Sequence, residues 1–204
     1  MEIKLANPQG KGLERISDAL QILQEVQVEH KKPIQILRDY CCSLLVLASE
    51  FSFLPIPNRY YFLFLSGEKF KLSPISPKEW GHSRFGDYIA KCRLETDMTW
   101  SGIWRHDLED FPALNAKIRG HMKDSLEMIF ESENMIENLP FCDRHLSYYR
   151  RVLALGLSSS IELSFKQVGF DCMSGREALE SFGGELKSLN KSLLSHDGGL
   201  GDLT

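Results

Sequence analysis

Hydrophobic residues in the first quarter of the chain recur at helical spacing. Residues 13–26 carry an apolar side chain every three or four positions, which predicts a half-buried helix. A second helix is expected over residues 34–49. It becomes apolar all round beyond Tyr40, as is typical of a centrally buried helix. The segment Pro55-Ile-Pro57-Asn58 ends it because proline cannot continue a helix.

The pattern changes to β-structure after residue 58. Residues 59–65 are rich in aromatic side chains, Ser66-Gly67 supplies a turn, and residues 69–73 alternate strictly between polar and apolar. A third alternating run covers residues 88–94, with Tyr88, Ala90, Cys92 and Leu94 on one face and Ile89, Lys91 and Arg93 on the other. The pattern predicts a three-stranded antiparallel meander within residues 59–95.

Helical spacing returns over residues 111–139 and 141–165. A last helix opens with Ser174-Gly-Arg-Glu177, the sequence of a capping box, and fades into a Gly-rich end. The predicted fold class is therefore α+β, with about five helices around a small three-stranded antiparallel sheet. We expect a single domain over residues 1–194, with a sheet unit at 58–104 and a flexible C-terminal tail at 195–204.

Composition and charge restrict the location and the partners. The chain has 204 residues and a net charge of −4, so a general basic coat for duplex DNA is absent. Its five cysteines form no C-x-x-C pair, and no apolar run approaches the ~20 residues that span a bilayer. The N-terminus also lacks the apolar stretch of a secretory signal. We expect a soluble cytoplasmic protein that does not bind membranes.

Basic residues concentrate on the predicted sheet, where residues 59–93 carry seven basic and three acidic side chains. Lys69 and Lys71 share one face of their strand, and Lys91 and Arg93 share one face of theirs. The first strand adds either Tyr61, Leu63 and Leu65 or Tyr60, Phe62 and Phe64 to the same face. Aromatic residues beside cations are suited to stacking on single-stranded RNA. The alternative, favoured by the frequency of surface charge pairs, is a helix-covered central strand with the acidic segment 124–137 neutralising the cations.

The segment Ser76-Pro-Lys-Glu-Trp-Gly81 combines a fixed φ at Pro77, an amphipathic Trp80 and a flexible Gly81. Trp80 with Lys78 and Glu79 forms either a binding hot spot or a single helical turn that caps the sheet. The second interpretation is favoured because small sheets lack apolar mass.

Several segments resemble a family of domains of unknown function that includes bacterial proteins and a small eukaryotic open-reading-frame protein. The resemblance covers residues 58–104. It is carried by Tyr60-Tyr61, the Ser66-Gly67 turn, Ile75-Ser-Pro-Lys-Glu-Trp-Gly81 and Leu94-x-x-Asp97-Met-Thr-Trp100. The opening Asn7-Pro-Gln-Gly-Lys-Gly12 is similar to the bacterial members. The resemblance implies that residues 58–104 form one structural unit, and it implies no activity.

Candidate catalytic and metal-binding residues are scattered. His106-Asp107 offers a general base, and Cys142-x-x-His145 has the i, i+3 spacing of a metal-binding pair or offers a nucleophile. No second pair completes a metal quartet, and neither motif lies in a recognisable catalytic context. We therefore expect no metal and no cofactor.

Three function hypotheses follow. The leading one is a non-enzymatic cytoplasmic adaptor that binds a protein partner or a second copy of itself through the sheet and the Trp80 loop. The first alternative is an RNA- or ribosome-associated factor that uses the basic strand face. The second alternative is an enzyme that uses His106 and Asp107 or Cys142 and His145. The candidate binding residues are Tyr61, Lys69, Lys71, Lys78, Glu79, Trp80, Lys91, Arg93 and Trp100.

Overall fold

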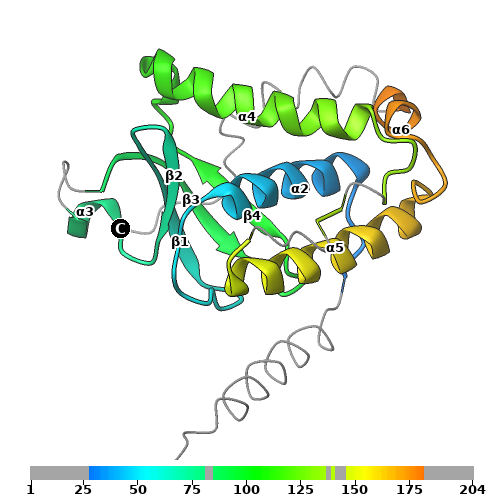
Figure 1. Ribbon diagram of the computed structural model, residues 1–204, viewed down its shortest axis with the longest axis horizontal. Coiled ribbons are helices and arrows are strands. Elements are labelled where there is room, and N and C mark those ends of the chain that lie inside the picture. The colour runs from blue at the N-terminus through cyan, green and yellow to red at the C-terminus, as the bar shows by residue number, and fades with distance from the viewer. Residues whose placement is uncertain (1–27, 81–84, 137–138, 141–145, 182–204) are drawn as a thin grey trace, which may run out of the picture.

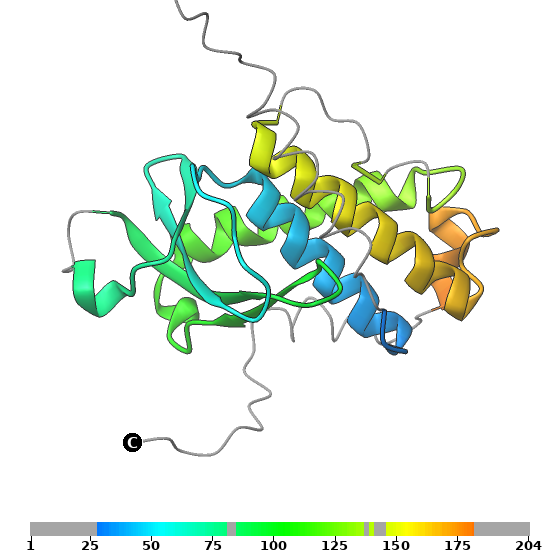
Figure 2. The same cartoon turned by 90° about the horizontal axis from the view of Figure 1, so that it is seen from below.

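Five helices and a four-stranded antiparallel sheet make up the described part of the computed structural model (Figures 1 and 2). The structure describes residues 28–80, 85–136, 139–140 and 146–181. The helices are α2 (Pro33–Ala48), α3 (Pro77–Trp80), α4 (Pro112–Phe130), α5 (Tyr148–Val168) and α6 (Gly175–Ser181), with a 3₁₀ turn η1 (Leu108–Asp110). The strands are β1 (Tyr60–Ser66), β2 (Lys69–Ser73), β3 (Asp87–Leu94) and β4 (Trp100–Trp104). The expected helix over residues 13–26 and the expected tail over 195–204 lie outside the described residues.

The strand order β2-β1-β3-β4 corrects the predicted three-stranded meander in two ways. First, β3 pairs with β1 and not with β2. The reason is that β1 is apolar on both faces and therefore takes a central position. Second, Trp100–Trp104 forms a fourth strand that the sequence analysis missed. Gly102 weakened the alternating pattern of a strand in this segment. Glycine suits the position, because a Cβ there would lie 3.0 Å from the Cys42 sulfur, closer than ordinary van der Waals contact.

A β-bulge in β3 changes which side chains share a face. Leu63 pairs with Ala90 and Phe64 pairs with Tyr88, so Ile89 is the extra residue. Strict alternation predicted that Tyr88 and Lys91 lie on opposite faces of their strand. The bulge brings the two side chains to the same face. Ile89 and Ala90 are both fully buried, which gives the bulge a packing reason.

Helix α2 lies between the sheet and α5, with α4 alongside it (Figures 1 and 2). It is buried nearly all round beyond Tyr40, as the sequence pattern predicted. The buried side chains of the sheet, α2, α4, α5 and α6 form one continuous apolar cluster. None of the described helices has the length and apolar character needed to cross a membrane.

Two helix boundaries differ from the expected ones. Helix α4 ends at Phe130 instead of residue 139. Helix α5 begins at Tyr148, and residues 141–145 of the helix expected from residue 141 lie outside the described residues. The end of α4 is a tertiary effect, because Ser132 leaves the helical path and its carbonyl accepts a hydrogen bond from the Gly175 amide at 3.0 Å. The predicted capping box of α6 is confirmed, since the Ser174 amide donates to the Glu177 carboxylate at 2.9 Å and the Glu177 amide donates to the Ser174 hydroxyl at 3.3 Å.

A buried ionic cluster fastens the segment before α2 to the turn between β3 and β4. The Lys31 ammonium lies 2.7 Å from a carboxylate oxygen of Asp39 and 2.7 Å from one of Asp97. The other Asp97 oxygen accepts hydrogen bonds from the amide and the hydroxyl of Thr99 at 3.0 and 2.6 Å. Asp97 and Thr99 belong to the segment Leu94-x-x-Asp97-Met-Thr-Trp100, which carries part of the family resemblance. Their role is structural, since they hold this turn on α2.

Candidate ligand-binding face of the sheet

The sheet has an inner face that packs on α2 and an outer face that points away from it. Register places the four predicted cations on the outer face, because Arg93 lies beside Tyr60, Lys91 beside Phe62, Lys71 beside Phe64 and Lys69 beside Ser66. We define the outer face as Tyr60, Phe62, Phe64, Lys69, Lys71, Ser73, Tyr88, Lys91, Arg93, Ser101 and Ile103. Among the described α-helices, only the single turn α3 lies over it. The expected helix-covered central strand is therefore found on one side only, because β1 is central and α2 covers its inner face.

The cations of the outer face differ in how they are paired. Lys69 lies 2.6 Å from Glu50 in a mostly exposed pair, and Arg93 lies 2.7 Å from Glu95. The Lys91 ammonium stands 3.8 Å from the centroid of the Tyr60 ring. Within the part of the chain that the structure describes, neither Lys91 nor Lys71 forms a salt bridge to a carboxylate. Residues 124–136, the described part of the acidic segment 124–137, contribute none of these partners, so the expected neutralisation is not seen there.

The Ser-Pro-Lys-Glu-Trp motif forms the turn α3 at one end of the outer face. The Ser76 amide donates to the Glu79 carboxylate at 3.2 Å, and Pro77 occupies the first helical position. The Trp80 indole donates to the Ser73 hydroxyl at 2.9 Å. Its ring stacks on Phe85 with centroids 4.8 Å apart. Trp80 is thus half-buried over the sheet, whereas Lys78 and Glu79 are exposed.

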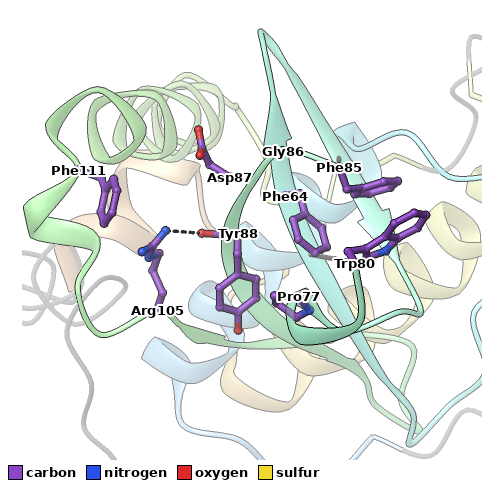
Figure 3. Close-up of a pocket in the computed structure, with 9 residues that line it drawn as sticks. All are labelled: Phe64, Pro77, Trp80, Phe85, Gly86, Asp87, Tyr88, Arg105 and Phe111. Carbon is purple, nitrogen blue, oxygen red and sulfur yellow. Dashed lines mark hydrogen bonds between the residues drawn. The ribbon is translucent and has the colours of Figure 1, made fainter. Parts of the chain in front are cut away.

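A hollow of about 280 Å³ opens beside Trp80 on the outer face. Figure 3 shows aromatic rings on one side of it and Arg105 with Phe111 on the other. The complete lining is Phe64, Pro77, Trp80, Phe85, Gly86, Asp87, Tyr88, Arg105 and Phe111. Burial raises the pKa of the Tyr88 phenol to about 12, so this side chain is neutral at physiological pH.

Arg105 is held in one orientation at the wall of this hollow. Its Nε and Nη2 atoms donate to the two carboxylate oxygens of Asp107, each at 2.6 Å, and Nη1 donates to the Tyr88 carbonyl at 3.1 Å. The guanidinium carbon lies 4.0 Å from the centroid of the Phe111 ring. The hydrogen bonds from Arg105 lower the pKa of the Asp107 carboxyl to about 2. Asp107 is therefore a counterion of Arg105, which is a poor arrangement for a general base beside His106.

The remaining candidate residues fall in two places. Tyr61 and Trp100 are on the inner face, where they are buried and their rings meet edge to face at 5.6 Å. The alternation of β1 decides this, because Tyr60 is the residue that reaches the outer face. Cys142 and His145 lie outside the described residues. No group of three or more His, Cys, Asp or Glu side chains is arranged to hold a metal in the described segments.

The sequence pattern did not mark Phe85, Tyr88, Arg105 and Phe111 as parts of a site. The Arg-x-Asp spacing of Arg105 and Asp107 was the available signal, because a carboxylate two residues away can orient a guanidinium. Nothing local could have placed Phe111 against Arg105 or Phe85 over Phe64. These contacts depend on how the chain returns to the sheet after β4 and before β3.

A second hollow of about 310 Å³ lies at the other end of the sheet. It is lined by Glu29, Lys31, Asp39, Asn58, Arg93, Glu95, Thr96, Asp97 and Ser101. Its central Lys31 already bridges Asp39 and Asp97, so the cluster has a structural role.

Comparison with known proteins places these features in a family. Residues 5–111 match the family described as "Protein of unknown function (DUF2452)". This range includes the whole outer face and the linings of both hollows, and it ends just before α4. No curated protein matches the chain, and no solved structure does. Since the match covers more than half of its 204 residues, the chain belongs to the DUF2452 family.

Proposed function

We propose that this protein is a cytoplasmic binding module for single-stranded RNA, which lies across the outer face of the sheet. The observation that carries the proposal is the strand register. It sets Lys71, Lys91 and Arg93 beside the aromatic residues of β1, and Lys69 beside Ser66, on the face opposite the large helices. Sheets that bind single-stranded RNA place stacking aromatic residues on their central strands and keep their helices on the other face.

The aromatic residues on the two central strands provide surfaces for base stacking. Tyr60 is 45% exposed, and Phe62 and Tyr88 are half-buried. The rings of Phe62 and Tyr88 are neighbours across β1 and β3, with centroids 6.4 Å apart. A stacked base is worth about 1–3 kcal/mol in such proteins. Two or three bases on these rings would supply a measurable affinity.

The cations provide contacts to phosphate. Lys91 can leave the Tyr60 ring for a phosphate when a base takes its place on that ring. Lys69 and Glu50 form an exposed pair, which contributes little to stability and can exchange for a phosphate contact. Glu50 and Glu95 also keep the total positive potential modest. We therefore expect moderate affinity that falls steeply with salt.

The adaptor hypothesis remains the competing candidate. It is favoured by exposed apolar side chains at the rim of the outer face, where Ile103 is 45% exposed and Phe111 is 39% exposed. A protein partner docked on these residues would bind mainly through apolar contact. Such binding depends weakly on salt, so ionic strength separates the two hypotheses.

The proposal is tested by fluorescence anisotropy with a labelled oligouridine of about 12 nucleotides, titrated from about 50 to 200 mM KCl. We expect Tyr60→Ala to weaken binding at least about fivefold, the loss of ~1 kcal/mol of stacking. Lys91→Gln should lower the slope of log K against log salt by about one. The matched control is Lys123→Gln, at an exposed lysine on α4 whose one salt bridge among the described residues is to Glu127.

Three results would overturn the RNA proposal. These are no binding at the lowest salt, equal binding of duplex and single-stranded RNA, or equal affinity of the Tyr60, Lys91 and Lys123 variants. A partner that stays bound at high salt and is lost on Ile103→Lys would support the adaptor hypothesis instead.

A further inference from the structure

The hollow beside Trp80 is continuous with the proposed RNA-binding face. Phe64 and Tyr88 belong to both, and the rings of these two residues meet edge to face at 5.9 Å. A strand that stacks on Phe62 and Tyr88 therefore reaches the hollow with its next bases. The hollow lies at the end of β3 where Lys71 also stands 5.6 Å from the Phe85 ring centroid.

The walls of the hollow are suited to a flat aromatic group. Trp80 and Phe85 form a stacked pair on one side, with their ring planes inclined by 18°. On the other side the planar guanidinium of Arg105 is supported by Phe111 (Figure 3). Unstacked RNA bases bind against aromatic rings and against arginine planes in this way. The volume of about 280 Å³ is large enough for one nucleobase.

The polar group on the wall distinguishes guanine from adenine and uracil. An arginine has five N–H bonds, and among the described residues Arg105 uses three of them, on Asp107 and on the Tyr88 carbonyl. The remaining two are donors, so they require a base edge with two acceptors. On the base edge that faces the major groove of a duplex, guanine offers O6 and N7 as adjacent acceptors. On the same edge adenine offers one acceptor and one donor, and uracil offers a single carbonyl acceptor.

We infer that this hollow is a subsite for an unpaired guanine base, with Arg105 donating to O6 and N7 and with Trp80 and Phe85 packing beside the ring. The inference rests on the proposed function and specifies the sequence preference of the same site. Asp107 contributes as a positioning residue, because its two hydrogen bonds hold the guanidinium plane in place.

The test compares three labelled oligouridines that carry a single central G, A or U. We expect the G oligomer to bind about tenfold more tightly than the U oligomer, the ratio typical of a bidentate arginine contact, and the A oligomer to bind like the U oligomer. Arg105→Lys retains the charge and removes the fork, so the G-to-U affinity ratio should fall to about one. Phe111→Leu, at a partly exposed position, should lower the same ratio without removing Arg105.

Arg119→Lys is the matched control, because Arg119 is exposed on α4 and bonds only Asn115 among the described residues. Its G-to-U ratio should equal that of the unaltered protein. A ratio near one in the unaltered protein overturns the guanine subsite and leaves the RNA proposal standing. A ratio that survives both Arg105→Lys and Phe111→Leu also overturns it. Failure of every oligomer to bind overturns the proposed function itself.

Discussion

Replacing Lys31 by Met tests whether the buried ionic cluster holds the sheet against α2. Lys31 lies 2.7 Å from both Asp39 and Asp97, and the Asp97 side chain is only 6% exposed. Removing the lysine leaves the buried Asp97 carboxylate and the partly buried Asp39 carboxylate without their shared cation. Loss of one partner of a buried ion pair costs about 3–5 kcal/mol. Because the Lys31 side chain keeps 20% exposure, we expect the lower end, about 3 kcal/mol.

The measurement is urea unfolding at pH 7, followed by circular dichroism. In a thermal melt of a chain of this size, the expected loss lowers Tm by about 6–12 °C. Lys166→Met is the matched control, because Lys166 is half-exposed and pairs only with Glu162 at 2.6 Å among the described residues. That variant should stay within about 0.5 kcal/mol of the unaltered protein.

The cluster also predicts how the loss depends on pH. Burial raises the pKa of the Asp39 carboxyl, Lys31 opposes this effect, and the Asp97 and Glu95 carboxylates add to it. A carboxyl with a raised folded-state pKa destabilises the fold when it is ionised, and this cost disappears as the pH falls towards its ordinary value. Without Lys31 the pKa rises further, so the deficit of Lys31→Met should shrink between pH 7 and pH 5.

Two results would refute this reasoning. If Lys31→Met unfolds at the same urea concentration as the Lys166 control, the cluster is not desolvated. If its deficit is constant between pH 7 and pH 5, the lost energy comes from packing and not from charge. Addition of Asp39→Asn to Lys31→Met should restore part of the stability, because one of the two unpaired carboxylates is then neutral.

Three further predictions concern other parts of the fold. Gly86→Ala should destabilise the fold by more than about 2 kcal/mol in thermal melts, because φ is +126° and the added Cβ would overlap the Leu65 carbonyl oxygen. Gly120→Ala is the control, since its added Cβ meets no atom within 4 Å, and it should be neutral or stabilising. Burial lowers the pKa of His121, so the free energy of unfolding should fall as the pH drops through the ordinary histidine value of 6.5, and His121→Gln should flatten this dependence in urea titrations. Trp80→Ala should cost about 2 kcal/mol in the same titrations, roughly half the value for a fully buried aromatic residue, and a cost near zero would show that the ring does not cap the sheet.

Much of the candidate site was visible in the sequence as separate pieces. The period-two pattern correctly paired Lys69 with Lys71 and Lys91 with Arg93 on their strands. It left open which of the two alternating sets of β1 side chains would share a face with these cations, since that strand is apolar on both faces. The pattern also placed Trp80 in a single turn, although it could not show that the ring would stack on Phe85.

The sequence by itself determined the elements that depend on neighbouring residues. The positions of α2, the β1–β2 hairpin and the α6 capping box follow from side-chain periodicity and local hydrogen bonds, which act within a few residues. Tertiary structure decided what depends on distant segments. Strand order placed β1 at the centre, the bulge at Ile89 turned Tyr88 to the outer face, and chain return after β4 brought Arg105 and Phe111 to the hollow. These outcomes depend on how segments far apart in the chain pack to bury apolar area, so no local pattern contains them.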